Sequence, residues 1–85
     1  MIDNRCNGWT NYETWKVKLE LIGDSHDYEI HTQSVDGLAK EMELYCEDII
    51  LCETKRGFAF DCAMNFLHQV NWREIAEHIM EENNL

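Results

Sequence analysis

The sequence contains no proline and only four glycines in 85 residues. Because these two residue types interrupt helices and mark the turns of strand-rich folds, their scarcity argues against a β-sandwich or a barrel. Glutamate and leucine, which both favour helices, are abundant, and lysine, methionine and alanine add further helix-favouring residues. We therefore predict an all-α fold.

The N-terminus lacks the basic patch and apolar run of a signal peptide, and no stretch of about eighteen uncharged apolar residues occurs. These absences argue against secretion and against contact with a membrane, so we expect a cytoplasmic location. In that reducing compartment, cysteines are normally free thiols. The chain has four of them: Cys6, Cys46, Cys52 and Cys62. They show no C-x2-C or C-x4-C spacing, and no histidine stands at a zinc-motif distance, so we expect no metal and no cofactor.

Basic residues are scarce as well, with seven Lys and Arg against seventeen Asp and Glu and a formal net charge of −10. Proteins that bind nucleic acid directly need cations to neutralise phosphates, and aromatic stacking platforms need cations beside them. We therefore expect no direct nucleic-acid binding. A chain of this length with 45% apolar residues is predicted to fold as one acidic domain, residues 1–85, around a single core.

Hydrophobic periodicity predicts a first helix over about residues 11–22. Thr10 and Glu13 have the spacing of a capping box, and Gly23 is typical of a helix end. The apolar residues recur at steps of three and four and are expected to be buried. They are Tyr12, Trp15, Leu19 and Ile22. The polar segment 24–33 is either a short fifth helix or an irregular connection.

A second long helix is predicted over 35–53, with Ser34 as its cap. Its expected apolar stripe is Leu38, Met42, Tyr45, Ile49 and Cys52. The segment 58–70 is apolar around most of its circumference, which predicts a central helix contacted on several sides. Asn71 is expected to cap a last helix over 72–82. The predicted core of this four-helix bundle is Trp15, Leu19, Leu38, Met42, Tyr45, Ile49, Phe66, Ile75 and Ile79.

The sequence shows no catalytic motif. No protease signature surrounds its cysteines. Glu74 and His78 lie four residues apart near the C-terminus, a spacing more typical of a surface pair on a helix than of acid–base chemistry. We therefore expect a binding protein and no enzyme.

Acidic residues are concentrated in one stretch. Ten acidic residues lie between Glu20 and Glu53, against Lys40 alone. On the predicted helix 35–53, Asp36, Glu43 and Glu47 are expected opposite the apolar stripe, with Glu41 and Asp48 beside them. Each like-charge neighbour four residues apart costs about 0.2–0.5 kcal/mol, which folding alone does not favour. These five carboxylates are the candidate partner-binding residues, and a merely solvated face is the alternative.

Two segments carry a resemblance to a known family. The N-terminal segment 8–15 reads GWTNYETW and the C-terminal segment 70–78 reads VNWREIAEH. Together they resemble a family of small uncharacterised proteins from phages and other mobile elements of bacteria and archaea. The resemblance implies a small accessory or host-takeover protein, and it supplies no activity and no functional residues.

These observations lead to two hypotheses. The first is an inhibitor of a host nucleic-acid-handling defence, of anti-CRISPR or anti-restriction type, that binds without catalysis to a protein or ribonucleoprotein with a basic nucleic-acid-binding surface. In this hypothesis the acidic face imitates the charge of DNA. The second is a small adaptor or scaffold that binds another protein through apolar or aromatic residues and whose acidic face is only solubilising. The oligomeric state is open in both.

Overall fold

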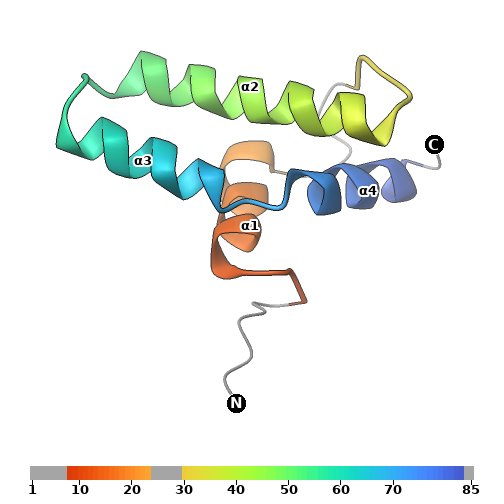
Figure 1. Ribbon diagram of the computed structural model, residues 1–85. Coiled ribbons are helices and arrows are strands. Elements are labelled where there is room, and N and C mark those ends of the chain that lie inside the picture. The colour runs from red at the N-terminus through yellow and green to blue at the C-terminus, as the bar shows by residue number, and fades with distance from the viewer. Residues whose placement is uncertain (1–7, 24–29, 84–85) are drawn as a thin grey trace.

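The computed structural model describes residues 8–23 and 30–83, and every regular element within these ranges is a helix. The helices are α1 (Tyr12–Val17), the π-helix η1 (Lys18–Ile22) that continues α1, α2 (Val35–Glu53), α3 (Phe58–His68) and α4 (Trp72–Glu82) (Figure 1). The predicted all-α fold is confirmed, as are the bounds predicted for α2 and α4. Residues 30–33 are not helical, and 24–29 lie outside the described ranges.

The helices are arranged around α2, the longest of them. α3 and α4 follow one another along the same side of α2, and α1 lies across them near the α3–α4 junction (Figure 1). The apolar core between these helices consists of Val17, Ile22, Leu38, Met42, Cys46, Leu67, Val70, Ile75, Ala76, Ile79 and Met80. The acidic helices α2 and α4 therefore pack against each other through one shared core.

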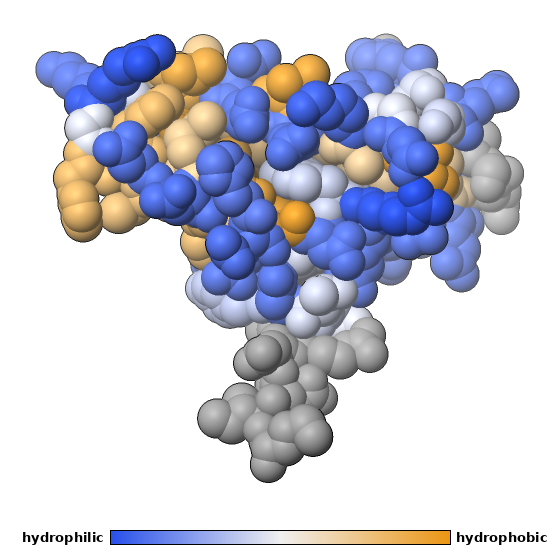
Figure 2. All heavy atoms as spheres, viewed as in Figure 1, coloured by the Kyte–Doolittle hydropathy of each residue, from blue (hydrophilic) through white to orange (hydrophobic). Residues whose placement is uncertain are grey.

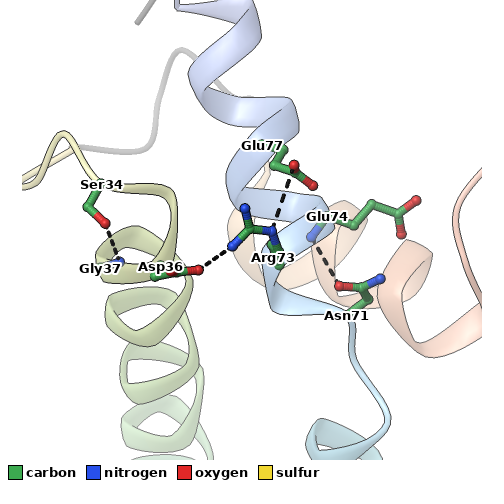
Figure 3. A network of polar contacts seen from close by, with 7 residues as sticks. All are labelled: Ser34, Asp36, Gly37, Asn71, Arg73, Glu74 and Glu77. Carbon is green, nitrogen blue, oxygen red and sulfur yellow. Dashed lines mark hydrogen bonds and ion pairs between the residues drawn. The ribbon is translucent and has the colours of Figure 1, made fainter.

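Two helices begin at the residues that the sequence predicts. The Ser34 Oγ accepts a hydrogen bond from the Gly37 N–H at 3.2 Å, and the Asn71 Oδ1 accepts one from the Glu74 N–H at 3.1 Å (Figure 3). Each side chain satisfies an amide that has no partner within its own helix. Both caps are confirmed, and they set the starting points of α2 and α4.

The predicted capping box at Thr10 is wrong by one residue. Asn11 is the cap, and its Oδ1 accepts hydrogen bonds from the Thr14 N–H at 2.8 Å and the Thr14 hydroxyl at 2.6 Å. The backbone of Asn11 is extended, so α1 begins at Tyr12. The N–H of Thr10 instead donates to the Glu74 carboxylate at 2.9 Å, which ties the N-terminal segment to α4.

This shift changes which face of the first helix is buried. Thr14, Val17 and Ile22 face the core, whereas Leu19 is 55% exposed and Trp15 is half-buried. The prediction of Leu19 as a core residue is therefore wrong. Because the π-turn over 18–22 holds one extra residue, Ile22 still reaches the core at the end of the helix.

The buried face of α2 is also rotated from the predicted stripe. Leu38, Met42 and Cys46 are fully buried at steps of four, whereas the predicted Tyr45 is 45% exposed and Cys52 is exposed. Helices that pack through rows of residues four apart present such a ridge to their neighbour. Ile49 is half-buried at the edge of this ridge, as Phe66 is on α3.

The prediction of 58–70 as a central helix is wrong. α3 ends at His68, and Leu67 is its one buried residue. The helix lies beside the C-terminal half of α2 at one end of the molecule (Figure 1), so only one of its sides faces the core. Apolar side chains on its other side face the solvent, most clearly Phe58, which is 86% exposed.

The two sequence motifs meet in space, where the first turns of α1 and α4 adjoin. The buried Thr14 hydroxyl accepts a hydrogen bond from the Asn71 N–H at 2.8 Å. Asn11 donates from Nδ2 to the Gln69 carbonyl at 2.8 Å. The Trp9 and His78 rings contact edge to face, with centroids 4.9 Å apart. The residues 8–15 and 70–78 thus form one structural unit.

Thr14→Val is expected to lower the free energy of unfolding by about 1–3 kcal/mol. Valine has nearly the shape of threonine, but it leaves the part-buried Asn71 N–H without its acceptor. Urea denaturation followed by circular dichroism measures the effect. Thr54→Val is the matched control, since the half-buried Thr54 hydroxyl has no hydrogen-bond partner within the described ranges. Equal stabilities of the two variants would contradict the prediction.

Candidate acidic interface

Most of the negative charge lies on two neighbouring helices. Together α2 and α4 carry ten carboxylates and two cations, a formal charge of −8 out of the total of −10. The core takes one side of each helix, so these carboxylates are left on the outer surface. Figure 2 shows hydrophilic side chains over much of the visible face of the molecule. The candidate interface is therefore wider than helix α2 alone.

The five predicted site residues divide between the two flanks of α2. With 100° per residue and the buried ridge at Leu38, Met42 and Cys46, the residues Asp36, Glu43 and Glu47 lie along one flank. Glu41 and Asp48 lie along the other flank. The structure thus corrects the expectation that the first three are opposite the core, because the buried ridge is not the predicted one.

Two leucines occupy the ridge between these flanks. Leu44 and Leu51 are 48% and 49% exposed and lie seven residues apart, two turns of α2. The periodicity argument assigned no role to them. Their spacing was visible in the sequence, but the sequence did not show that they face the solvent.

Two of the five carboxylates pair with a cation within the chain, and a third contacts a histidine. Lys40 lies 3.3 Å from Glu43, and His31 Nδ1 lies 3.0 Å from Glu41. Asp36 pairs with Arg73 of α4. Within the part of the chain that the structure describes, Glu47 and Asp48 have no such cation. The uncompensated negative charge is therefore centred on the adjacent pair Glu47 and Asp48.

Arg73 connects the acidic residues of α2 to those of α4. Its guanidinium contacts Asp36 of α2 and lies 3.9 Å from Glu77 one turn further along α4 (Figure 3). All three side chains are more than half exposed, so each pair is worth at most about 1 kcal/mol. One arginine between two carboxylates leaves a net negative charge, and the acidic surface continues across it.

A hollow of about 350 Å³ lies on the α4 side of this surface. It is lined by Gly8, Trp9, Glu74, Glu77, His78 and Glu81. These carboxylates lie outside the acidic stretch from Glu20 to Glu53 on which the predicted interface was based. The recurrence of Glu74, Glu77 and Glu81 on one face of α4 was the available signal. Because it combines carboxylates with an indole ring, this hollow favours the binding of a positively charged side chain from a partner.

The predicted pairing of Glu74 with His78 is not formed. Glu74 accepts the hydrogen bond from the Thr10 N–H, and His78 forms an ion pair with Glu82. These contacts give both side chains a structural role at the junction of the two motifs. The geometry offers no acid–base pair at this position.

The described cysteines are free thiols, with Cys46 buried and Cys52 and Cys62 exposed. Burial, together with the nearby Glu47 carboxylate, raises the pKa of Cys46 to about 12. Cys46 is therefore a neutral, poorly reactive thiol at neutral pH. Cys6 and His26 lie outside the described ranges. Across residues 8–23 and 30–83, no three His, Cys, Asp or Glu side chains are grouped to hold a metal ion.

Among the described residues, no helix is long and apolar enough to cross a bilayer.

Comparison with known proteins gives one match. A family profile described as "Family of unknown function (DUF7249)" covers residues 2–85. No curated protein and no solved structure matches the chain. The profile spans both sequence motifs and both acidic helices, and it assigns no activity to any of them.

Proposed function

The chain belongs to the DUF7249 family, whose function is unknown, and we propose that it is a non-catalytic inhibitor that binds a basic, nucleic-acid-binding surface of a partner protein. The acidic surface of α2 and α4 takes the place of nucleic acid on that partner. The two motifs resemble small proteins of phages and mobile elements. We therefore place the partner among the host defence complexes that anti-CRISPR or anti-restriction proteins inhibit, in the cytoplasm. The partner is a protein or a ribonucleoprotein.

The observation that carries this proposal is the concentration of a −8 formal charge on two adjacent helices. Glu43 and Glu47 lie one turn apart, about 6 Å along the axis of α2, so neighbouring carboxylates lie within a Debye length of about 8 Å. Charges this close reinforce one another. Basic channels for nucleic acid gain much of their affinity from such closely spaced negative charges.

The ion pairs within the chain do not remove this surface. Exposed pairs such as Lys40–Glu43 and Arg73–Asp36 contribute about 0–1 kcal/mol and exchange readily with other ions. A dense set of cations on a partner can therefore replace Lys40 or Arg73. Glu47 and Asp48 need no such exchange, which makes them the central contacts of the proposed interface.

Displacement of nucleic acid from the partner tests the proposal. The tagged protein is used to capture its partner from host lysate, and the purified partner is mixed with a fluorescent oligonucleotide. We expect the oligonucleotide to be released stoichiometrically, as measured by fluorescence polarisation. Binding should also weaken as the salt concentration rises. A partner that keeps its oligonucleotide, or whose affinity is indifferent to salt, would rule out charge mimicry.

A second function is favoured by the exposed leucines on α2. If the protein is an adaptor, Leu44 and Leu51 form the contact and the carboxylates on either side keep the surface soluble. Replacing both leucines with serine separates the two functions, because it leaves the charge unchanged. Loss of capture in this variant identifies the adaptor, and retained capture identifies the acidic interface.

A further inference from the structure

Helix α3 has an apolar face that the rest of the chain leaves open. Phe58, Ala59 and Cys62 are exposed on it. Phe58, Cys62 and Phe66 lie four residues apart, so they form one row along the helix. A helix that is apolar on nearly all sides is normally buried on nearly all sides. Here only Leu67 is buried, and Figure 2 shows the uncovered hydrophobic side chains at the end of the molecule where α2 and α3 meet.

A groove of about 370 Å³ adjoins this row. Its lining is mostly apolar and includes Val17, Ile50, Cys62, Ala63, Phe66 and Leu67. Cys62 and Phe66 thus belong both to the open row of α3 and to the groove. On the α1 and η1 side the groove is also lined by Leu21 and by Lys16 and Glu20, which form an ion pair at 3.1 Å.

We propose that this face is a dimer interface, occupied by the same face of a second copy of the chain. In a symmetric dimer with antiparallel α3 helices, a two-fold axis at Cys62 sets Phe58 of each copy opposite Phe66 of the other. The protruding Phe58 then enters the groove that Phe66 lines. One row therefore supplies both the projecting side chain and the cavity that receives it, as a two-fold interface requires.

The charge distribution identifies a second copy as the occupant. Two chains of −10 each repel one another over α2 and α4, but α3 carries only the single carboxylate Asp61. The loop before α3 holds Lys55 and Arg56. In the antiparallel arrangement this cationic loop lies toward the end of the other copy's α3, where the acidic helix α4 follows. The apolar face is thus also the face on which the least negative charge opposes the approach of a second acidic chain.

Sedimentation velocity over a range of protein concentrations tests the dimer. We expect the parent protein to show twice the monomer mass at high concentration, and Phe58→Asp to sediment as a monomer throughout. Phe58 is the first residue of α3, a position that favours aspartate, so this variant should remain folded. Leu44→Asp is the matched control: it places the same charge at an exposed apolar residue of α2, and it should remain a dimer.

Thiol crosslinking tests the position of the axis. A short bismaleimide should join two chains through Cys62, so Cys62→Ser should abolish the crosslinked dimer and Cys52→Ser should not. Buried Cys46, whose pKa is raised, should stay unmodified at neutral pH.

The dimer and the acidic interface respond to salt in opposite directions. Because added salt screens the repulsion between two chains of like charge, it should strengthen the dimer while it weakens binding to a basic partner. A parent protein that stays monomeric at every concentration overturns the dimer, and so does a dimer that Phe58→Asp leaves intact. Neither result affects the proposed inhibition, which depends on the carboxylates of α2 and α4 and is measured by displacement of the oligonucleotide.

Discussion

Replacing Glu43, Glu47 and Asp48 together with lysine is expected to abolish binding to the partner while leaving the fold intact. The change removes three carboxylates and adds three cations, which reverses the charge at the centre of the proposed interface. Glu47 and Asp48 have no counter-ion within the described ranges. All three side chains lie on the flanks of α2, away from the ridge of Leu38, Met42 and Cys46. The melting temperature should therefore change little.

The three carboxylates also account for part of the salt dependence of binding, as the phosphate contacts that they imitate do. For nucleic acid, each phosphate contact contributes a slope of about −0.9 in log affinity against log salt, so three contacts weaken about 40-fold between 50 and 200 mM salt. Carboxylates on a protein condense fewer counter-ions than phosphates do, which makes this value an upper bound for three carboxylates. A single reversal, largely screened at physiological salt, should have a much smaller effect than the triple one.

A control with the same change in net charge separates location from total charge. Glu13, Glu20 and Asp61 lie outside α2 and α4, and their joint replacement by lysine should leave binding largely intact. Isothermal titration calorimetry with the purified partner measures both variants. Equal affinity of the α2 variant and the parent would show that the acidic flanks are not the interface.

Met42→Ala is expected to lower the free energy of unfolding by about 2–5 kcal/mol, the largest effect on stability that we predict. Met42 is fully buried where α2 packs against α4, and its truncation leaves a cavity in the core that these helices share. A chain of 85 residues has about 4–13 kcal/mol of stability in total, so the loss is a large part of it. The melting temperature should fall by about 4–8 °C for each kcal/mol.

Tyr45→Ala is the comparison that tests the orientation of α2. Tyr45 belongs to the stripe that the sequence predicts, but 45% of it is exposed. Its truncation should therefore cost much less than that of Met42, as measured by thermal denaturation followed by circular dichroism. A larger cost at Tyr45 than at Met42 would mean that the predicted stripe is the buried one after all.

The sequence was sufficient where a structural feature depends on neighbouring residues alone. The caps at Ser34 and Asn71 and the buried face of α4 were predicted correctly, because a cap and a regular stripe are local patterns. At the first helix, Thr10 and Asn11 are both good cap residues. The choice between them is made by contacts with α4, in which Thr10 binds Glu74 and Asn71 while Asn11 binds Gln69. Such contacts join residues about 60 positions apart, so local patterns do not reveal them.

Local patterns are insufficient for the candidate site on α2 for the same reason. Apolar residues occur on nearly every side of this helix, so two stripes fit the sequence, and packing against α3 and α4 selects the one with Cys46. The five acidic candidates were found from the charge alone. Their pairing was not, since the contact of Asp36 with Arg73 depends on how α4 lies beside α2. The spacing of Glu77 and Glu81 on one face of α4 is visible in the sequence, but that they extend the acidic surface of α2 depends on how α4 lies beside α2.

The joined caps of α1 and α4 make the two ends of the chain depend on each other during folding. The hydrogen bond between Thr14 and Asn71 closes a loop of 57 residues, and loop-closure entropy must be overcome before that bond forms. Each cap is itself local, since Asn11 accepts from the Thr14 N–H and Asn71 accepts from the Glu74 N–H. What the two ends share is the set of hydrogen bonds between the caps, so opening one end leaves the Asn71 N–H and the Thr10 N–H without their acceptors. The N-terminal segment and the C-terminal helix behave as one cooperative unit, and removing either by truncation or proteolysis weakens the remaining one.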